Sequence, residues 1–69
     1  MSTLKVNGVD RHYPDGLPAS LTNLMDELHI NAATVVAEVD GSIVKRADFS
    51  TTALEQGQTI ELIRFVGGG

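Results

Sequence analysis

The sequence has no cysteine, and it contains only two histidines, His12 and His29, which lie far apart along the chain. Without thiols, neither a disulfide nor a zinc–thiolate site can stabilise the fold, and we expect no metal site. No apolar run approaches the roughly 18 to 20 residues that cross a bilayer, and residues 1–5 form no apolar signal region. We therefore expect a cytoplasmic protein with no membrane partner, held together by burial of apolar side chains alone.

Basic residues are also scarce. Five lysines and arginines stand against nine aspartates and glutamates, which gives a net charge of -4. A protein that binds the phosphate backbone needs the opposite excess, so we expect no nucleic acid partner. The composition, 42% hydrophobic and 20% charged, is that of a folded domain. In a chain of 69 residues we expect one domain over 1–66, followed by a flexible glycine tail over 67–69.

Two dipeptides, Asn7-Gly8 and Asp40-Gly41, predict β-hairpins. Both pairs accept the positive φ angles of a two-residue type I′ turn. The strands that they join are expected at 4–6 and 9–13, and at 34–39 and 42–46. After the first hairpin, the run from Pro14 to Pro18 predicts a loop, because proline cannot donate a ladder hydrogen bond.

One segment has helical periodicity. Its apolar residues recur at i, i+3, i+4 and i+7, which places them on one face of a helix that packs on the sheet. These residues are Leu21, Leu24, Met25 and Leu28. Ser20 is placed to cap the first turn, and Asn31 is expected to end the helix in the left-handed conformation. Asp26 and Glu27 are expected on the solvated face of the helix.

The remaining elements complete an α+β fold. Residues 48–50 predict a turn or a short 3₁₀ helix with Phe49 in the core, and residues 59–66 predict the last strand. The order hairpin, helix, hairpin, strand places the last strand parallel to the first, in the middle of a mixed sheet. We expect a β-grasp, or ubiquitin-like, roll in which four to five strands pack on one main helix.

The last strand also suggests a surface for a partner. If Ile60 and Leu62 face the helix, period-2 alternation turns Ile63 and Phe65 outward. Together with Val66, these two side chains are candidates for an apolar partner-binding patch. The alternative is that neighbouring chains or flanking side chains merely half-bury this face.

The order of these elements resembles the ubiquitin-like sulfur carriers, and among them the ThiS type involved in thiamine synthesis. The resemblance spans nearly the whole chain and depends on the order and spacing of its segments. These segments are Val6-Asn7-Gly8, the helical leucines, Val39 to Val44 with Arg46, Gly57, Ile60 to Leu62, and the glycines that follow Phe65-Val66. Two residues depart from the family pattern: Lys45 stands where such carriers often have proline, and Gln58 where aspartate often follows the glycine. These departures leave the thiamine, molybdopterin and amino-acid branches of the family open.

The carboxylate of Gly69 is the group on which this resemblance centres. An ionised carboxylate is a poor electrophile, and the sequence contains no motif that could activate it. The resemblance implies an ATP- and Mg-dependent adenylyltransferase of the ThiF or MoeB type, which adenylates Gly69 and converts it to a thiocarboxylate. The sulfur then passes to a thiazole synthase. On this interpretation the chain is not an enzyme, has no catalytic residue and binds no cofactor of its own.

Gly67 and Gly68 suit a tail that enters a narrow channel, because they lack Cβ atoms. Several alternatives use the same residues. Within the family, the sulfur could serve the synthesis of molybdopterin, cysteine or homocysteine. Beyond sulfur transfer, the chain could be a ubiquitin-like modifier joined to lysines through Gly69, or a β-grasp interaction module that does not need its tail. The three glycines could also be no more than a frayed terminus.

Overall fold

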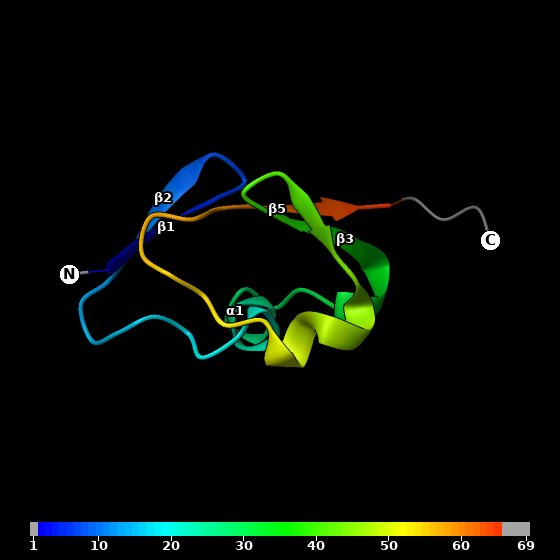
Figure 1. Ribbon diagram of the computed structural model, residues 1–69, viewed down its shortest axis with the longest axis horizontal. Helices are drawn as coiled ribbons and strands as arrows, with labels where there is room; N and C mark the ends of the chain where they lie inside the picture. Colours follow the sequence, from blue (N-terminus) through cyan, green and yellow to red (C-terminus); the bar gives the residue numbers. More distant parts are fainter. Residues whose placement is uncertain (1, 66–69) are drawn as a thin grey trace.

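The computed structural model describes residues 2–65. These residues form five strands, one α-helix and two short 3₁₀ helices. In chain order the elements are β1 (Ser2–Val6), β2 (Val9–Tyr13), α1 (Leu21–Glu27), η1 (Ala32–Thr34), β3 (Val35–Val39), β4 (Ser42–Val44), η2 (Arg46–Thr51) and β5 (Thr59–Arg64). The helix lies against one face of the sheet, as the side view shows (Figure 1).

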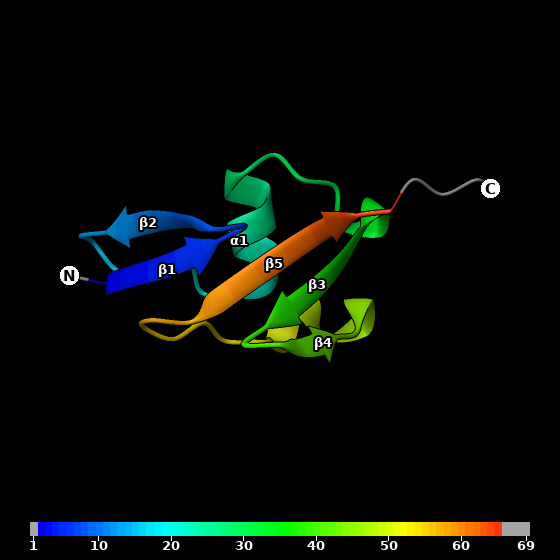
Figure 2. The ribbon, with the colours of Figure 1, turned by 90° about the horizontal axis from the view of Figure 1, so that it is seen from above.

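The strand order in the sheet is β2-β1-β5-β3-β4. β5 runs parallel to β1 and antiparallel to β3, so the last strand occupies the centre of a mixed sheet (Figure 2). Its C-terminal end lies at the end of the molecule opposite to the start of β1. The predicted β-grasp fold is confirmed, including the parallel pairing of the first and last strands.

Both hairpin turns form as predicted. Asn7 and Gly8 have φ angles of 49° and 81°, and Asp40 and Gly41 have φ angles of 50° and 84°, as a type I′ turn requires. The second hairpin is shorter than expected, because β4 ends at Val44 and not at residue 46. Lys45 instead precedes the 3₁₀ helix η2, which brings Phe49 into the core with 3% of its surface exposed.

Helix α1 begins as predicted. The Ser20 side chain accepts a 3.3 Å hydrogen bond from the Asn23 backbone N–H, and its hydroxyl donates to Asn23 Oδ1 at 2.6 Å. This reciprocal arrangement satisfies an amide at the N-terminus of the helix that has no partner within the helix. Leu21, Leu24 and Met25 are buried against the sheet, as their spacing predicted.

The prediction for the end of the helix is wrong. His29, and not Asn31, adopts the left-handed conformation, with a φ angle of 58°. The His29 N–H donates to Asp26 O at 3.1 Å and the Ile30 N–H donates to Met25 O at 2.9 Å, which is the pair of bonds of a Schellman motif. Asn31, at φ -77°, instead caps η1 by accepting a bond from the Ala33 N–H.

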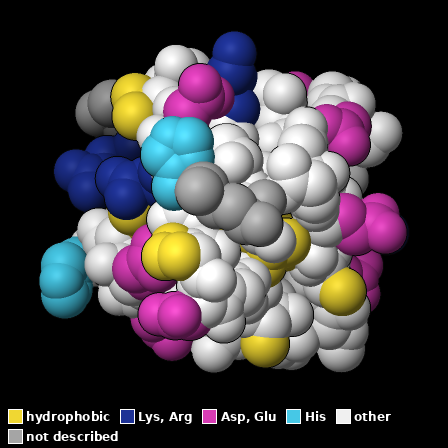
Figure 3. Space-filling model, turned by 90° about the vertical axis from the view of Figure 1, so that its left-hand side faces the viewer, with side chains coloured by type: hydrophobic (Ala, Val, Ile, Leu, Met, Phe, Trp, Pro, Cys, Tyr) yellow, Lys and Arg dark blue, Asp and Glu magenta, His cyan; other side chains and the backbone are white. Residues whose placement is uncertain are grey.

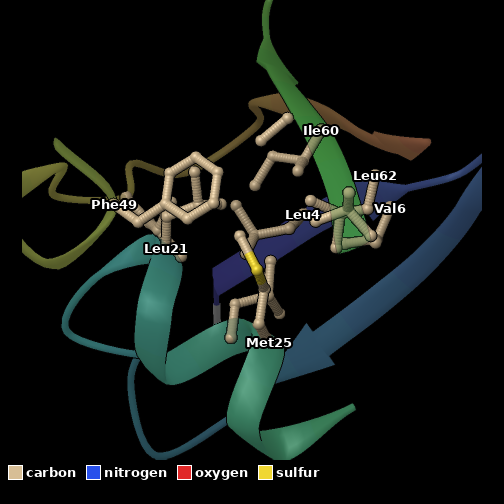
Figure 4. Packing of buried hydrophobic residues seen from close by; sticks show 11 residues of the cluster. Leu4, Val6, Leu21, Met25, Phe49, Ile60 and Leu62 are labelled. Atoms are coloured by element: carbon tan, nitrogen blue, oxygen red, sulfur yellow. The ribbon is translucent and has the colours of Figure 1, made fainter. Parts of the chain in front are cut away.

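The core lies between the helix and the sheet. Leu4 on β1 and Ile60 on β5 are fully buried and point toward Leu21 and Met25 of the helix (Figure 4). Phe49 closes the core from the side of η2. Apolar contacts with β1 and α1 therefore fix the central strand β5, whose C-terminal end leads to the glycine tail.

Candidate functional site

The candidate site is the C-terminal end of β5 and the tail that follows it. The structure describes β5 through Arg64 and the next residue, Phe65. The predicted functional residues Val66, Gly67, Gly68 and Gly69 lie outside the described residues, so the role of each remains a prediction. The geometry of the site therefore begins with the strand that leads to them.

The expected alternation of β5 is observed. Ile60 and Leu62 are 0% and 7% exposed and face the helix, whereas Ile63 and Phe65 are 49% and 50% exposed. Ile63 near the end of β5 and Phe65 just after the strand are thus two large, half-exposed apolar side chains shortly before the tail in the sequence. Large apolar groups at such a position favour contact with another protein.

Two further apolar side chains lie on the same outer face, and sequence analysis did not single them out. Val36 on β3 lies directly opposite Ile63, so their side chains share one face of the sheet. Ile43, on the edge strand β4, is 71% exposed and lies on the same face. We call Val36, Ile43, Ile63 and Phe65 the outer apolar patch. Extending the alternation to the second hairpin would have indicated Val36 and Ile43.

Two carboxylates adjoin the outer apolar patch. Glu38 on β3 lies directly opposite Glu61 on β5, and Ile43 is the cross-strand partner of Glu38 on its other side. Two like charges in facing positions of a sheet repel each other. The patch therefore combines apolar side chains with local negative charge, which suits a partner that presents basic groups.

The end of β5 is held on both sides. Toward β3, the Phe65 N–H donates to Thr34 O at 3.1 Å. Toward β1, the Asn7 side chain accepts a 2.7 Å bond from the Leu62 N–H and donates a 3.3 Å bond to Leu62 O. Sequence analysis treated Asn7 only as a turn residue, because a contact between positions 55 residues apart leaves no local signal.

The opposite end of the molecule carries charged and histidine side chains, with a few apolar side chains scattered among them (Figure 3). A hollow of about 480 Å³ lies along β2 and the loop after it, with Glu27 of the helix on its wall. There the Tyr13 hydroxyl donates to Glu27 at 2.8 Å. Burial, followed by this bond and the Glu27 charge, raises the pKa of Tyr13 to about 12.

In the part of the chain that the structure describes, neither histidine joins a cluster of ligating groups. His12, on the edge strand β2, lies with its Nδ1 3.1 Å from Thr3 Oγ1, and His29 ends the helix. Within residues 2–65, no group of three or more histidine, aspartate or glutamate side chains is arranged to hold a metal ion. No helix in this part of the chain is long and apolar enough to cross a bilayer.

Comparisons with known proteins agree with this geometry. The model of the ThiS family matches residues 4–69. A crystal structure of the thiamine biosynthesis protein ThiS from Geobacter metallireducens superposes with a TM-score of 0.83 at 29% identity, and the match covers 97% of this chain and 99% of that chain. A solution structure of a thiamine biosynthesis protein from the same organism has a TM-score of 0.76 at 29% identity, with coverage of 97% and 87%.

A curated relative extends the comparison. This chain is 27% identical over 66 residues to a thiazole synthase from Paramagnetospirillum magneticum. The match covers 96% of this chain but only 20% of the relative, so the chain spans about a fifth of that protein's length. The family match includes the terminal glycines, and the fold match spans nearly all of the chain.

Proposed function

Since this chain belongs to the ThiS family, the β-grasp sulfur carriers of thiamine biosynthesis, we propose that it carries sulfur as a thiocarboxylate at Gly69. The observation that carries the proposal is the family match through residue 69 on a fold whose central strand leads directly to the glycine tail. A carrier of this kind is a substrate of other enzymes and not a catalyst.

The chemistry begins with activation of the carboxylate. An oxygen of the Gly69 carboxylate attacks the α-phosphorus of ATP, pyrophosphate leaves, and a mixed anhydride with AMP forms. A sulfur nucleophile then attacks the activated carbonyl carbon and AMP leaves, so the carboxylate becomes a thiocarboxylate. ATP and Mg²⁺ belong to the partner, an adenylyltransferase of the ThiF or MoeB type. Glycine suits the reacting position because its small size lets the backbone approach the nucleotide closely.

The outer apolar patch is the surface that we propose for this adenylyltransferase. Ile63 and Phe65 lie shortly before the tail in the sequence, so an enzyme that covers them is placed to receive the C-terminal carboxylate. Val66 belongs to the same proposed surface. The facing carboxylates of Glu38 and Glu61 favour a partner with basic side chains around its binding site, which would also accelerate association.

The proposed sulfur acceptor is a thiazole synthase. The similarity between this chain and one fifth of a protein named thiazole synthase supports this choice over the molybdopterin and amino-acid branches. The resemblance to thiamine biosynthesis proteins of Geobacter metallireducens supports it as well. On this proposal the thiocarboxylate sulfur attacks an electrophilic carbon of the substrate held by the synthase and forms a thioester. Water then cleaves the bond between the Gly69 carbonyl carbon and sulfur, so the sulfur stays on the substrate and the carrier regains its carboxylate.

Intact-protein mass spectrometry tests the proposal. The chain is incubated with ATP, Mg²⁺, a sulfide source and a ThiF-type adenylyltransferase, and a gain of about 16 Da is expected, because sulfur replaces one oxygen of the carboxylate. A variant that lacks Gly68 and Gly69 should stay unmodified. An unchanged mass of the full chain, together with no release of pyrophosphate, would contradict the proposal. An isopeptide bond between Gly69 and lysines of other proteins would instead indicate a modifier.

A further inference from the structure

The turn residues of the two hairpins both bind the last strand. Asn7 and Asp40 each occupy the first position of a type I′ turn, with φ angles of 49° and 50°. The side-chain oxygen of Asp40 accepts a 2.8 Å bond from the Thr59 N–H, and that of Asn7 accepts a 2.7 Å bond from the Leu62 N–H. Two equivalent residues, one on each side of β5, thus hold it at two points.

These two points differ in their distance from the tail. Asp40 holds Thr59, the first residue of β5, whereas Asn7 holds Leu62, near the end of the strand. Asn7 also bonds both backbone groups of Leu62, because its Nδ2 donates to Leu62 O at 3.3 Å. The Asn7 carboxamide therefore takes the place of a strand residue at a position where β1 has already ended, at Val6.

The backbone groups of β5 bond alternately toward β3 and toward β1, which shows why the contact between Asn7 and Leu62 matters. Thr59 and Phe65 bond toward β3, through Asp40 N and Thr34 O respectively. Because backbone groups of successive strand residues point to opposite sides, the even-numbered residues of β5 point toward β1. On that side the Asn7 N–H donates to Ile60 O at 2.9 Å and the Asn7 side chain bonds Leu62. Within residues 2–65, Asn7 makes the last bond to β5 on the β1 side.

We propose that Asn7 is a positioning residue for the reaction at Gly69. It acts through Leu62, and it fixes the direction in which the chain passes Ile63 and Phe65 and leaves the domain. Without it, the segment after Leu62 is held only from the β3 side. The inference rests on the proposed function, because it concerns how the Gly69 carboxylate reaches the site of adenylation. Misplacing a reacting group by about 1 Å can lower a rate by as much as roughly 100-fold.

The test compares Asn7→Gly with Asp40→Gly. Glycine accepts the φ angles of both turns, so each variant keeps its hairpin and loses only side-chain bonds to β5. Adenylation by a ThiF-type enzyme is followed by ATP–pyrophosphate exchange at increasing carrier concentration, at a temperature where thermal unfolding shows both variants to be folded. Asn7→Gly should lower kcat about 10-fold with little change in KM, and Asp40→Gly should stay within about 2-fold of the wild type.

Two further measurements separate positioning from stability. Amide hydrogen exchange should accelerate at Leu62 in Asn7→Gly and at Thr59 in Asp40→Gly. Asn7→Asp, which keeps the acceptor oxygen for the Leu62 N–H but loses the donor, should fall between the wild type and Asn7→Gly in kcat. Equal losses of kcat in the two glycine variants, or no loss in Asn7→Gly, would overturn the proposal.

Failure of the proposed function gives a different result. If the wild-type chain is not adenylated at all, the sulfur-carrier chemistry is wrong, whatever Asn7 does. Residual dipolar couplings of the N–H groups of residues 63–65 then decide the role of Asn7. A reorientation in Asn7→Gly that is absent in Asp40→Gly supports its control of this segment, and unchanged couplings in both variants refute it.

Discussion

The Tyr13 hydroxyl donates a 2.8 Å hydrogen bond to the carboxylate of Glu27, which links the edge strand β2 to the last residue of helix α1. Glu27 was expected on the solvated face of the helix, and it is exposed, but it also bonds the sheet. The contact closes the sheet onto the helix at the end of the molecule remote from the tail.

This contact predicts a loss of stability at high pH. The pKa of Tyr13 is raised from 10.0 to about 12 in the folded chain, chiefly by burial and then by Glu27. The stabilisation is therefore complete below pH 10 and is lost as the pH rises from about 10 to 12. Tyr13 is the only tyrosine, so the ultraviolet absorbance of its phenolate reports this titration directly.

Tyr13→Phe is the matched control for that titration. It should lower the free energy of unfolding at neutral pH by about 1 kcal/mol, because Glu27 loses its donor. It should also remove the part of the high-pH decline that belongs to Tyr13. An absorbance midpoint at the ordinary tyrosine pKa in the wild-type chain would contradict the predicted coupling.

His29→Gly should stabilise the chain. His29 has a φ angle of 58°, which strains an L-residue but not glycine, and the backbone bonds of the Schellman motif do not need its side chain. We expect the free energy of unfolding, measured by urea denaturation, to rise by about 0.5 to 1 kcal/mol, because relief of roughly 1 to 2 kcal/mol of left-handed strain exceeds the added chain entropy of glycine. Asn31→Gly should destabilise instead, because Asn31 has a φ angle of -77° and caps η1. Stabilisation of both variants would argue against this assignment of the helix end.

Phe49→Ala should unfold most of the chain. Phe49 is 3% exposed and closes the core beside the helix. Its truncation leaves a cavity that costs about 3 to 5 kcal/mol, whereas a domain of this size has a total stability of roughly 3 to 10 kcal/mol. Circular dichroism should show loss of cooperative folding. Phe49→Leu, which fills more of the space, should keep a cooperative transition at lower temperature, and a near-native Phe49→Ala would exclude the core role.

Phe65→Asp should separate partner binding from folding. Phe65 is 50% exposed, so the change should leave the thermal transition almost intact. Affinity for the adenylyltransferase, measured by calorimetry, should fall at least about 30-fold, as expected for loss of an aromatic anchor. Val9→Asp is the control. Val9 is 59% exposed, but it is the cross-strand partner of the core residue Val6 and therefore lies on the helix-facing side of the sheet, away from the outer apolar patch. Equal affinity losses in both variants would remove the outer apolar patch as the binding surface.

The sequence by itself determined the elements and their order. Asn7-Gly8 and Asp40-Gly41 specify type I′ turns because few other pairs accept two positive φ angles, and the leucine spacing specifies a helix with one apolar face. Alternation along 60–65 was enough to separate Ile60 and Leu62 from Ile63 and Phe65. These are local rules, in which a residue and its near neighbours decide the outcome.

Only the tertiary structure decided which distant groups meet. The Asn7 carboxamide bonds Leu62, Val36 faces Ile63, and Tyr13 bonds Glu27. Each pairing depends on register and packing, which exist only once the sheet has closed on the helix. The tertiary structure also decided where the helix ends. Packing and the backbone bonds to Met25 and Asp26 place His29 in the left-handed conformation, although Asn31 has the better intrinsic preference for it.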